Sequence, residues 1–87
     1  MLTVTEEASV YLAKLLAVER TPEDRAFRLC ADGESLGLIV DRPRSGDAAF
    51  AHRGRIVLVL DTDVVRWLES RTLDVQPSEL GRQLAVE

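Results

Sequence analysis

The sequence has a single cysteine, few aromatic residues and no long apolar run, and each shortage excludes a class of protein. Cys30 is the only thiol among 87 residues, so neither a disulfide within the chain nor a zinc site built from several cysteines can form. Aromatic residues make up 5% of the chain, so aliphatic side chains must build the core. No stretch approaches the roughly 18 apolar residues of a membrane span, and we expect no membrane partner.

The net charge and the N-terminal residues argue against nucleic-acid binding and secretion. Eleven basic residues against fifteen acidic ones give a net charge of −4, which disfavours nucleic acid as a partner. Glu6 and Glu7 follow the first apolar residues at once and Lys14 interrupts the run, so the N-terminus does not read as a signal peptide. A reduced, cytoplasmic location is therefore the expectation, and the lone Cys30 agrees with it.

Length and periodicity predict one globular domain that spans residues 1–87. Apolar residues recur at three- and four-residue steps from Thr5 to Glu19, which predicts a helix with Thr5 as its N-cap. A second, short helix is predicted from Asp63 to about Ser70, with Asp61 or Thr62 as its cap.

Strands are predicted where the period changes to two or the run is wholly apolar. They cover residues 26–31, 36–40, 48–51, 56–60, 73–75 and 82–86. Turns are predicted at 32–35, 42–47 and 77–81, and at 52–54 as a hairpin with Gly54 at positive φ. Since most connections are too short for parallel crossovers, the fold class is α+β with mainly antiparallel strands, one N-terminal helix and one short helix.

The core is predicted around the unbroken apolar run at residues 56–60, which is typical of a strand buried on both faces. The short helix is expected to turn Trp67 and Leu68 inward. The residues predicted to be largely buried are Leu12, Leu16, Phe27, Phe50, Val57, Leu58, Val59, Trp67 and Leu68.

Few residues are candidates for chemistry. Cys30 could be a metal or cluster ligand or a redox nucleophile, but a small side chain filling a strand position is the favoured interpretation. His52 lies at the predicted hairpin tip, where solvation is the usual fate. Asp61 and Asp63 could form a carboxylate pair, although helix capping explains both more simply. No phosphate-binding glycine loop, nucleophile elbow or zinc-protease motif is present, so we predict no enzymatic activity, no catalytic residues and no cofactor.

A local basic patch stands out in this acidic chain. Its members lie on two loops that a meander of strands could bring together, which would create a docking site for an acidic protein partner; scattered, solvated charges are the simpler alternative. The residues are Arg42, Arg44, Arg53 and Arg55.

The chain resembles the HesB/IscA-like family, the A-type iron–sulfur carriers, over nearly its whole length. The resemblance is carried by LTVTEEAS before a helix, FRL at a strand start, DRPRSGD before a short strand and IVLVLD. Its most specific block is DTDVVRWLESRTLDV at residues 61–75, which matches the family's spacing without a gap. The resemblance implies the compact, strand-rich HesB-like domain.

The chain departs from the family at the cluster site. The resemblance implies one cysteine in the loop after the first strand and two in a Cys-Gly-Cys tail. Here that loop reads GESLG at residues 33–37, with Ser35 nearest to the family's cysteine, and the chain stops at Glu87, where the tail would begin. Cys30 matches no family ligand, so no metal or cofactor residue can be assigned from the resemblance.

The function predicted from these observations is that of a non-enzymatic accessory or protein-interaction module that has lost the iron–sulfur cluster site. The alternative is iron or iron–sulfur binding through Cys30 across an oligomer. A protein partner is expected, and a homo-oligomer is possible.

Overall fold

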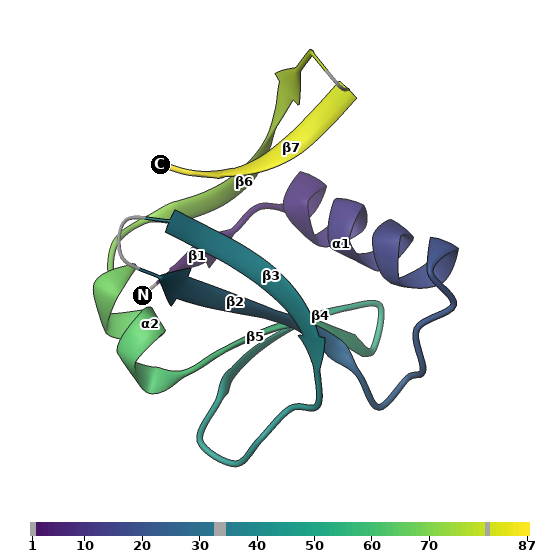
Figure 1. Ribbon diagram of the computed structural model, residues 1–87, viewed down its shortest axis with the longest axis horizontal. Coiled ribbons are helices and arrows are strands. Elements are labelled where there is room, and N and C mark those ends of the chain that lie inside the picture. Colours follow the sequence, from purple (N-terminus) through teal and green to yellow (C-terminus); the bar gives the residue numbers. More distant parts are fainter. Residues whose placement is uncertain (1, 33–34, 80) are drawn as a thin grey trace.

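The computed structural model describes residues 2–32, 35–79 and 81–87. Strands dominate it, and two helices complete the α+β architecture that the sequence predicts (Figure 1). In chain order the elements are β1 (Thr3–Val4), α1 (Glu6–Val18), β2 (Ala26–Asp32), β3 (Ser35–Asp41), β4 (Ala48–His52), β5 (Arg55–Leu60), α2 (Thr62–Trp67), β6 (Thr72–Ser78) and β7 (Gly81–Val86).

The larger sheet has four strands in the order β3-β2-β5-β4. β2 pairs antiparallel with β3 and parallel with β5, and β4 pairs antiparallel with β5. β5 is therefore an inner strand, and the four residues Val57–Leu60 are fully buried, as its apolar run predicts. The β4–β5 hairpin turns through Arg53 (φ 50°) and Gly54 (φ 82°). The positive φ of Gly54 is as predicted, and positive φ at both central residues is typical of a tight two-residue hairpin turn.

The smaller sheet has three strands in the order β1-β6-β7. β1 was not predicted, because two residues are too short to show a period; it pairs parallel with the start of β6. β6 continues to Ser78, past the predicted end at Val75, so the prediction of a turn at Pro77 is wrong. Pro77 pairs with Arg82 of β7 and lies beyond the two residues of β6 that pair with β1. The missing backbone N–H of Pro77 therefore interrupts none of the strand pairings among the described residues. The rest of the predicted turn includes Leu80, which lies outside the described residues.

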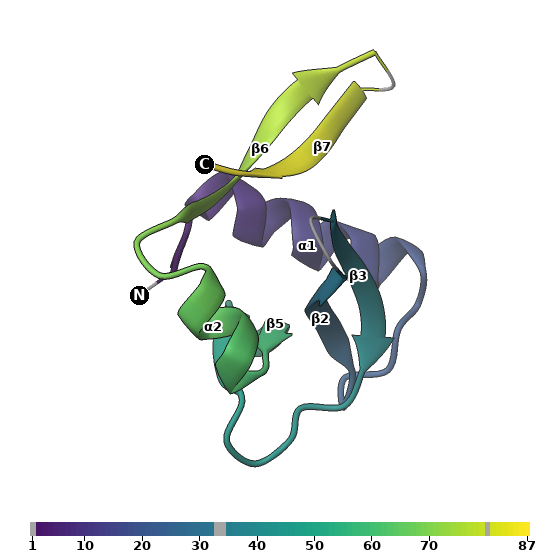
Figure 2. The ribbon, with the colours of Figure 1, turned by 60° about the vertical axis from the view of Figure 1, so that its left-hand side comes forward.

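α1 lies between the two sheets and contacts β6 of one and β4 and β5 of the other (Figure 1, Figure 2). Its Leu12 and Leu16 are fully buried. Thr5 is the N-cap as predicted: its hydroxyl accepts a hydrogen bond from the amide of Ala8 at 3.1 Å and donates one to Asp74 Oδ1 at 2.7 Å. One side chain thus starts the helix and ties it to β6. Neither helix of the described chain has the length and hydrophobicity to cross a membrane.

The core prediction is confirmed for the aliphatic residues and wrong for Trp67. Phe27 and Phe50 are half-buried and pack against the core. α2 ends at Trp67 instead of near Ser70, and Trp67 is 50% exposed, whereas Leu68 just after it is buried. Val64 and Val65 of α2 pack against the core together with Leu68, and the indole of Trp67 turns outward.

Candidate functional site: an apolar cleft between two edge strands

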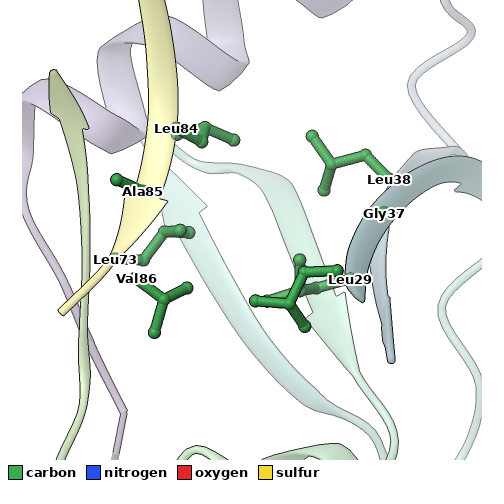
Figure 3. A pocket seen from close by; sticks show the side chains of 8 residues that line it. Leu29, Gly37, Leu38, Leu73, Leu84, Ala85 and Val86 are labelled. Atoms are coloured by element: carbon green, nitrogen blue, oxygen red, sulfur yellow. The ribbon is translucent and has the colours of Figure 1, made fainter. Parts of the chain in front are cut away.

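A cleft of about 280 Å³ opens between β3 and the β6–β7 hairpin (Figure 3). Leu36 and Leu38 form one wall and Leu84 and Val86 form the other, while Leu29 of β2 contributes from the sheet. The period of two along each strand explains the arrangement: Leu38 pairs with Leu29, so both side chains leave the sheet on the same face. The lining residues are Leu29, Leu36, Gly37, Leu38, Leu73, Leu84, Ala85 and Val86.

The cleft continues into a second hollow of about 250 Å³ beside α2. Leu36 and Val86 line both cavities, and the second adds Trp67, Leu68 and Arg71. The exposed indole of Trp67 therefore lines a hollow of mixed polar and apolar character next to the apolar cleft. Exposed tryptophans next to apolar pockets are frequent anchors of protein interfaces.

One side of this cleft adjoins the loop after β2, where the sequence resemblance implies one of the family's cysteines. Gly33 and Glu34 lie outside the described residues, but Leu36 directly follows the position of Ser35 and lines the cleft with Val86, near the end of the described chain. The sequence resemblance placed one family cysteine in the loop at residues 33–37 and the other two in a tail beginning at the end of the chain, but it did not predict a cavity. The alternation of Leu36 with Leu38, and of Leu84 with Val86, was the available signal.

Cys30 and His52 are not brought to this cleft. Since Leu29 lines it, the next residue, Cys30, points to the opposite face of β2; its Sγ lies 3.8 Å from the carbonyl oxygen of Arg28. His52 flanks the hairpin turn but is mostly buried rather than solvated, and its Nδ1 lies 4.0 Å from Glu6 Oε1. Among the described residues no three His, Cys, Asp or Glu side chains gather closely enough to hold a metal ion.

A buried arginine, Arg28, organises the face of β2 that lies away from the cleft. Its side chain is 3% exposed, although a charged residue on a half-buried strand is usually taken as solvated. It donates to Asp47 through two nitrogens (3.1 and 2.7 Å), to Asp41 at 2.9 Å, to Asp61 at 2.5 Å and to the carbonyl of Arg42 at 3.2 Å. These five hydrogen bonds match the five N–H donors of a guanidinium.

The cluster perturbs the ionisation of its members. The hydrogen bonds from Arg28 lower the pKa of Asp47, while the amide of Arg42, and after it Arg28, lowers the pKa of Asp41. The same contacts, led by Asp47, raise the pKa of Arg28. Asp61 precedes α2 as predicted but makes no side-chain capping bond, because its carboxylate is turned to Arg28. Arg28 therefore fastens both the 42–47 loop and the start of α2 to the sheet.

Three of the four arginines of the basic patch lie beside residues 21–25. Arg42 Nε is 3.7 Å from Asp24, and Arg55 donates to the carbonyl oxygens of Thr21 and Pro22. Arg53 and Arg55 line a hollow together with Pro43 of the other loop, whereas Arg44 pairs with Asp41 at 2.8 Å. The docking of an acidic partner here stays a prediction.

Comparisons with known proteins show which fold the chain has. No protein-family model matches the chain, and no curated protein is significantly similar to it in sequence. Among solved structures, SufA of Escherichia coli, involved in the biosynthesis of iron–sulfur clusters, aligns with a TM-score of 0.72 and 21% identity over 99% of this chain and 83% of that one. IscA with a [2Fe–2S] cluster aligns with a TM-score of 0.64 and 15% identity over 100% and 81%.

A protein from Aquifex aeolicus, solved by NMR in solution, aligns with a TM-score of 0.61 and 22% identity over 99% of this chain and 89% of that one. At such identities the likeness establishes the fold alone. The chain thus has the A-type iron–sulfur carrier fold, and the resemblance seen in the sequence is confirmed at that level.

Proposed function

We propose that the chain is a non-enzymatic protein-interaction module, related to iron–sulfur cluster assembly through its fold, in which an apolar cleft binds a partner protein instead of a cluster. One observation carries the proposal: the eight residues that line the cleft are leucine, glycine, alanine and valine. None of these side chains offers the thiolate or imidazole that iron–sulfur clusters require. The cleft can instead bury apolar side chains of a partner, each of which contributes about 1.5–3 kcal/mol when fully buried.

The shape of the cleft favours a protein over a small molecule as the bound partner. Its volume of about 280 Å³ lies just under the roughly 300–1,000 Å³ of ordinary small-molecule sites, and its lining brings no convergent polar groups to orient such a ligand. The adjoining hollow shares Leu36 and Val86 with the cleft and brings in the exposed Trp67 beside Arg71. A groove that ends at an aromatic side chain suits the apolar anchors of a polypeptide.

The alternative function, iron or cluster binding through Cys30 across an oligomer, would use the other face of β2. Cys30 and His52 would have to converge from two copies, yet they lie on different strands, and no pocket found in the described part of the chain is lined by both. The cleft, by contrast, is already formed in one copy. We therefore place the binding function in the cleft.

Capture of partners from the native host tests the proposal. The tagged wild-type protein, a cleft variant Leu84→Gln and a surface control Val18→Gln are compared after circular dichroism confirms that all three are folded. Proteins identified by mass spectrometry with the wild type and the control but lost with Leu84→Gln support binding in the cleft. Identical sets for all three variants would show that the cleft is not the binding site.

A further inference from the structure

The turn of the β4–β5 hairpin lies between two surface hollows. One hollow, of about 340 Å³, is shared with the connector at residues 21–25, and the other, of about 460 Å³, is shared with α1. Arg53 of the turn and Arg55 of β5 line both hollows, so the two adjoin at the hairpin. We call these two adjoining hollows the basic groove.

Positive charge outweighs negative charge in the basic groove. Its lining includes one acidic side chain, Glu23, against one lysine and three arginines: Lys14, Arg25, Arg53 and Arg55. The chain as a whole has a net charge of −4, so the groove reverses the overall balance. A local field of this kind attracts negatively charged partners.

The groove differs from the basic patch that the sequence predicts. Two of the four predicted arginines, Arg42 and Arg44, pair with aspartates at 3.7 and 2.8 Å. Lys14 and Arg25 join the other two because α1 and the connector after it lie beside the hairpin. The groove therefore combines three segments that are separate in the sequence.

The charges of the groove are little neutralised within the chain. Lys14 and Arg53 are exposed and belong to none of the ion pairs between described residues. Arg55 donates at 2.9 and 3.1 Å to carbonyl oxygens of the connector instead of to a carboxylate. Arg25 Nε lies 3.8 Å from Asp24, which is too far for a hydrogen bond. The Nε atoms of Arg25 and Arg55 are buried without an acceptor in the described part of the chain, so both guanidiniums are incompletely satisfied.

The side of the groove formed by α1 adds an apolar surface. Val10, Ala13 and Ala17 follow one another at steps of three and four residues, so they lie on one face of the helix. Lys14 borders this face. The side chains of the two alanines and the valine are small, which leaves space for apolar side chains of a partner. The groove thus offers basic groups and an apolar surface side by side.

We infer that the basic groove binds an acidic segment of a partner protein that carries both carboxylates and apolar side chains. Guanidiniums bind carboxylates through two parallel hydrogen bonds, and a lysine adds a point charge. A short acidic segment meets only the groove, whereas a nucleic acid would extend its charge along a protein of net charge −4. The inference goes beyond the proposed function, because the groove and the apolar cleft share no lining residue.

Fluorescence anisotropy tests the inference with two short labelled peptides. In one peptide glutamate alternates with leucine, and in the other glutamine replaces every glutamate. The wild type should bind the glutamate peptide with a dissociation constant below about 1 mM, at least about tenfold more tightly than the glutamine peptide. The double variant Lys14→Gln/Arg53→Gln should bind the glutamate peptide at least about tenfold more weakly than the wild type.

The matched control removes two positive charges outside the groove. Arg66 on α2 and Arg82 on β7 are both exposed, and Arg66→Gln/Arg82→Gln should bind the glutamate peptide like the wild type. Raising the salt concentration from about 0.1 M to about 1 M shortens the screening length from about 10 Å to about 3 Å and should weaken the binding. A DNA duplex added as a competitor should not displace the peptide.

An NMR titration of the wild type with the glutamate peptide locates the binding site. The amide resonances of residues 13–17 and 53–55 should shift, and those of residues 84–86 in the cleft should not. Absence of binding, equal affinities for the two peptides, unchanged affinity in the groove variant or displacement by DNA would each overturn the inference. Shifts confined to residues 84–86 would also overturn it and would place the peptide in the cleft, so the two proposals fail separately.

Discussion

Removal of the Arg28 side chain should destabilise the domain more than any surface substitution. In Arg28→Met the methionine keeps much of the apolar stem, but Asp47 loses its bidentate partner while its side chain is only 7% exposed. Breaking a buried ion pair by removing one partner typically costs 3–5 kcal/mol. We take about 3 kcal/mol, the low end, because Asp61 is 54% exposed and is resolvated easily.

That loss is a large part of the total stability. A domain of this size is stable by roughly 5–10 kcal/mol, and 1 kcal/mol corresponds to about 4–8 °C in melting temperature. Thermal unfolding followed by circular dichroism should therefore show a Tm lowered by about 15 °C in Arg28→Met. A decrease of less than about 3 °C would refute the view that Arg28 fastens the 42–47 loop and α2 to the sheet.

The pH dependence of the stability provides a second test of the cluster around Arg28. The fold lowers the pKa of Asp41 and Asp47 below the ordinary 3.8, so their ion pairs stabilise the protein fully above about pH 5 and are lost as the pH falls through the folded-state pKa. The stability gap between the wild type and Arg28→Met should accordingly shrink below pH 4. A gap that stays constant from pH 7 to pH 2 would contradict the proposed pairing.

Two further predictions concern helix ends and the core. Thr5→Ala should lower the free energy of unfolding by about 1–2 kcal/mol, because it removes both the N-cap of α1 and the hydrogen bond to Asp74. Thr5→Ser keeps the hydroxyl and should retain most of the wild-type stability. Urea denaturation measures both variants, and equal losses would contradict the capping role. Trp67→Ala should lower the free energy of unfolding by less than about 1.5 kcal/mol, because half of the Trp67 surface is exposed. Leu58→Ala should lower it by about 2–5 kcal/mol, because Leu58 is fully buried. A larger loss for Trp67→Ala than for Leu58→Ala in the same urea titration would show that the indole belongs to the core.

Features of the fold set by local chemistry were predictable from the sequence. The Thr5 cap, the buried strand at 57–60 and the positive φ of Gly54 each follow from residues close together in the chain. The strand was predicted to end before Pro77 because proline usually marks a turn. In the structure Pro77 is tolerated in β6, beyond the two residues that pair with β1. Trp67 was predicted to point inward because tryptophan is usually buried. A helix of six residues has too few turns to show in the sequence which side faces the core.

The site was less predictable, because it depends on contacts between distant segments. The cleft joins β3, which ends at Asp41, to β7, which begins at Gly81, so its leucines look separately like ordinary strand positions. Arg28 was passed over for the same reason: Asp41, Asp47 and Asp61 surround it only after the 42–47 loop returns over the sheet. Its alternation with Leu29 in the sequence indicates the face opposite the cleft, but nothing nearby in the sequence indicates that this face is covered.

Anaerobic reconstitution tests the central proposal, that this chain with the iron–sulfur carrier fold offers an apolar cleft for a partner and holds no cluster. The purified protein is incubated with iron and sulfide, desalted and analysed for both elements, with Cys30→Ala treated in parallel. We predict no more iron or sulfide in the wild type than in Cys30→Ala, and no cluster absorption in either. Stoichiometric iron and sulfide in the wild type, lost in Cys30→Ala, would contradict the account and place cluster binding at Cys30.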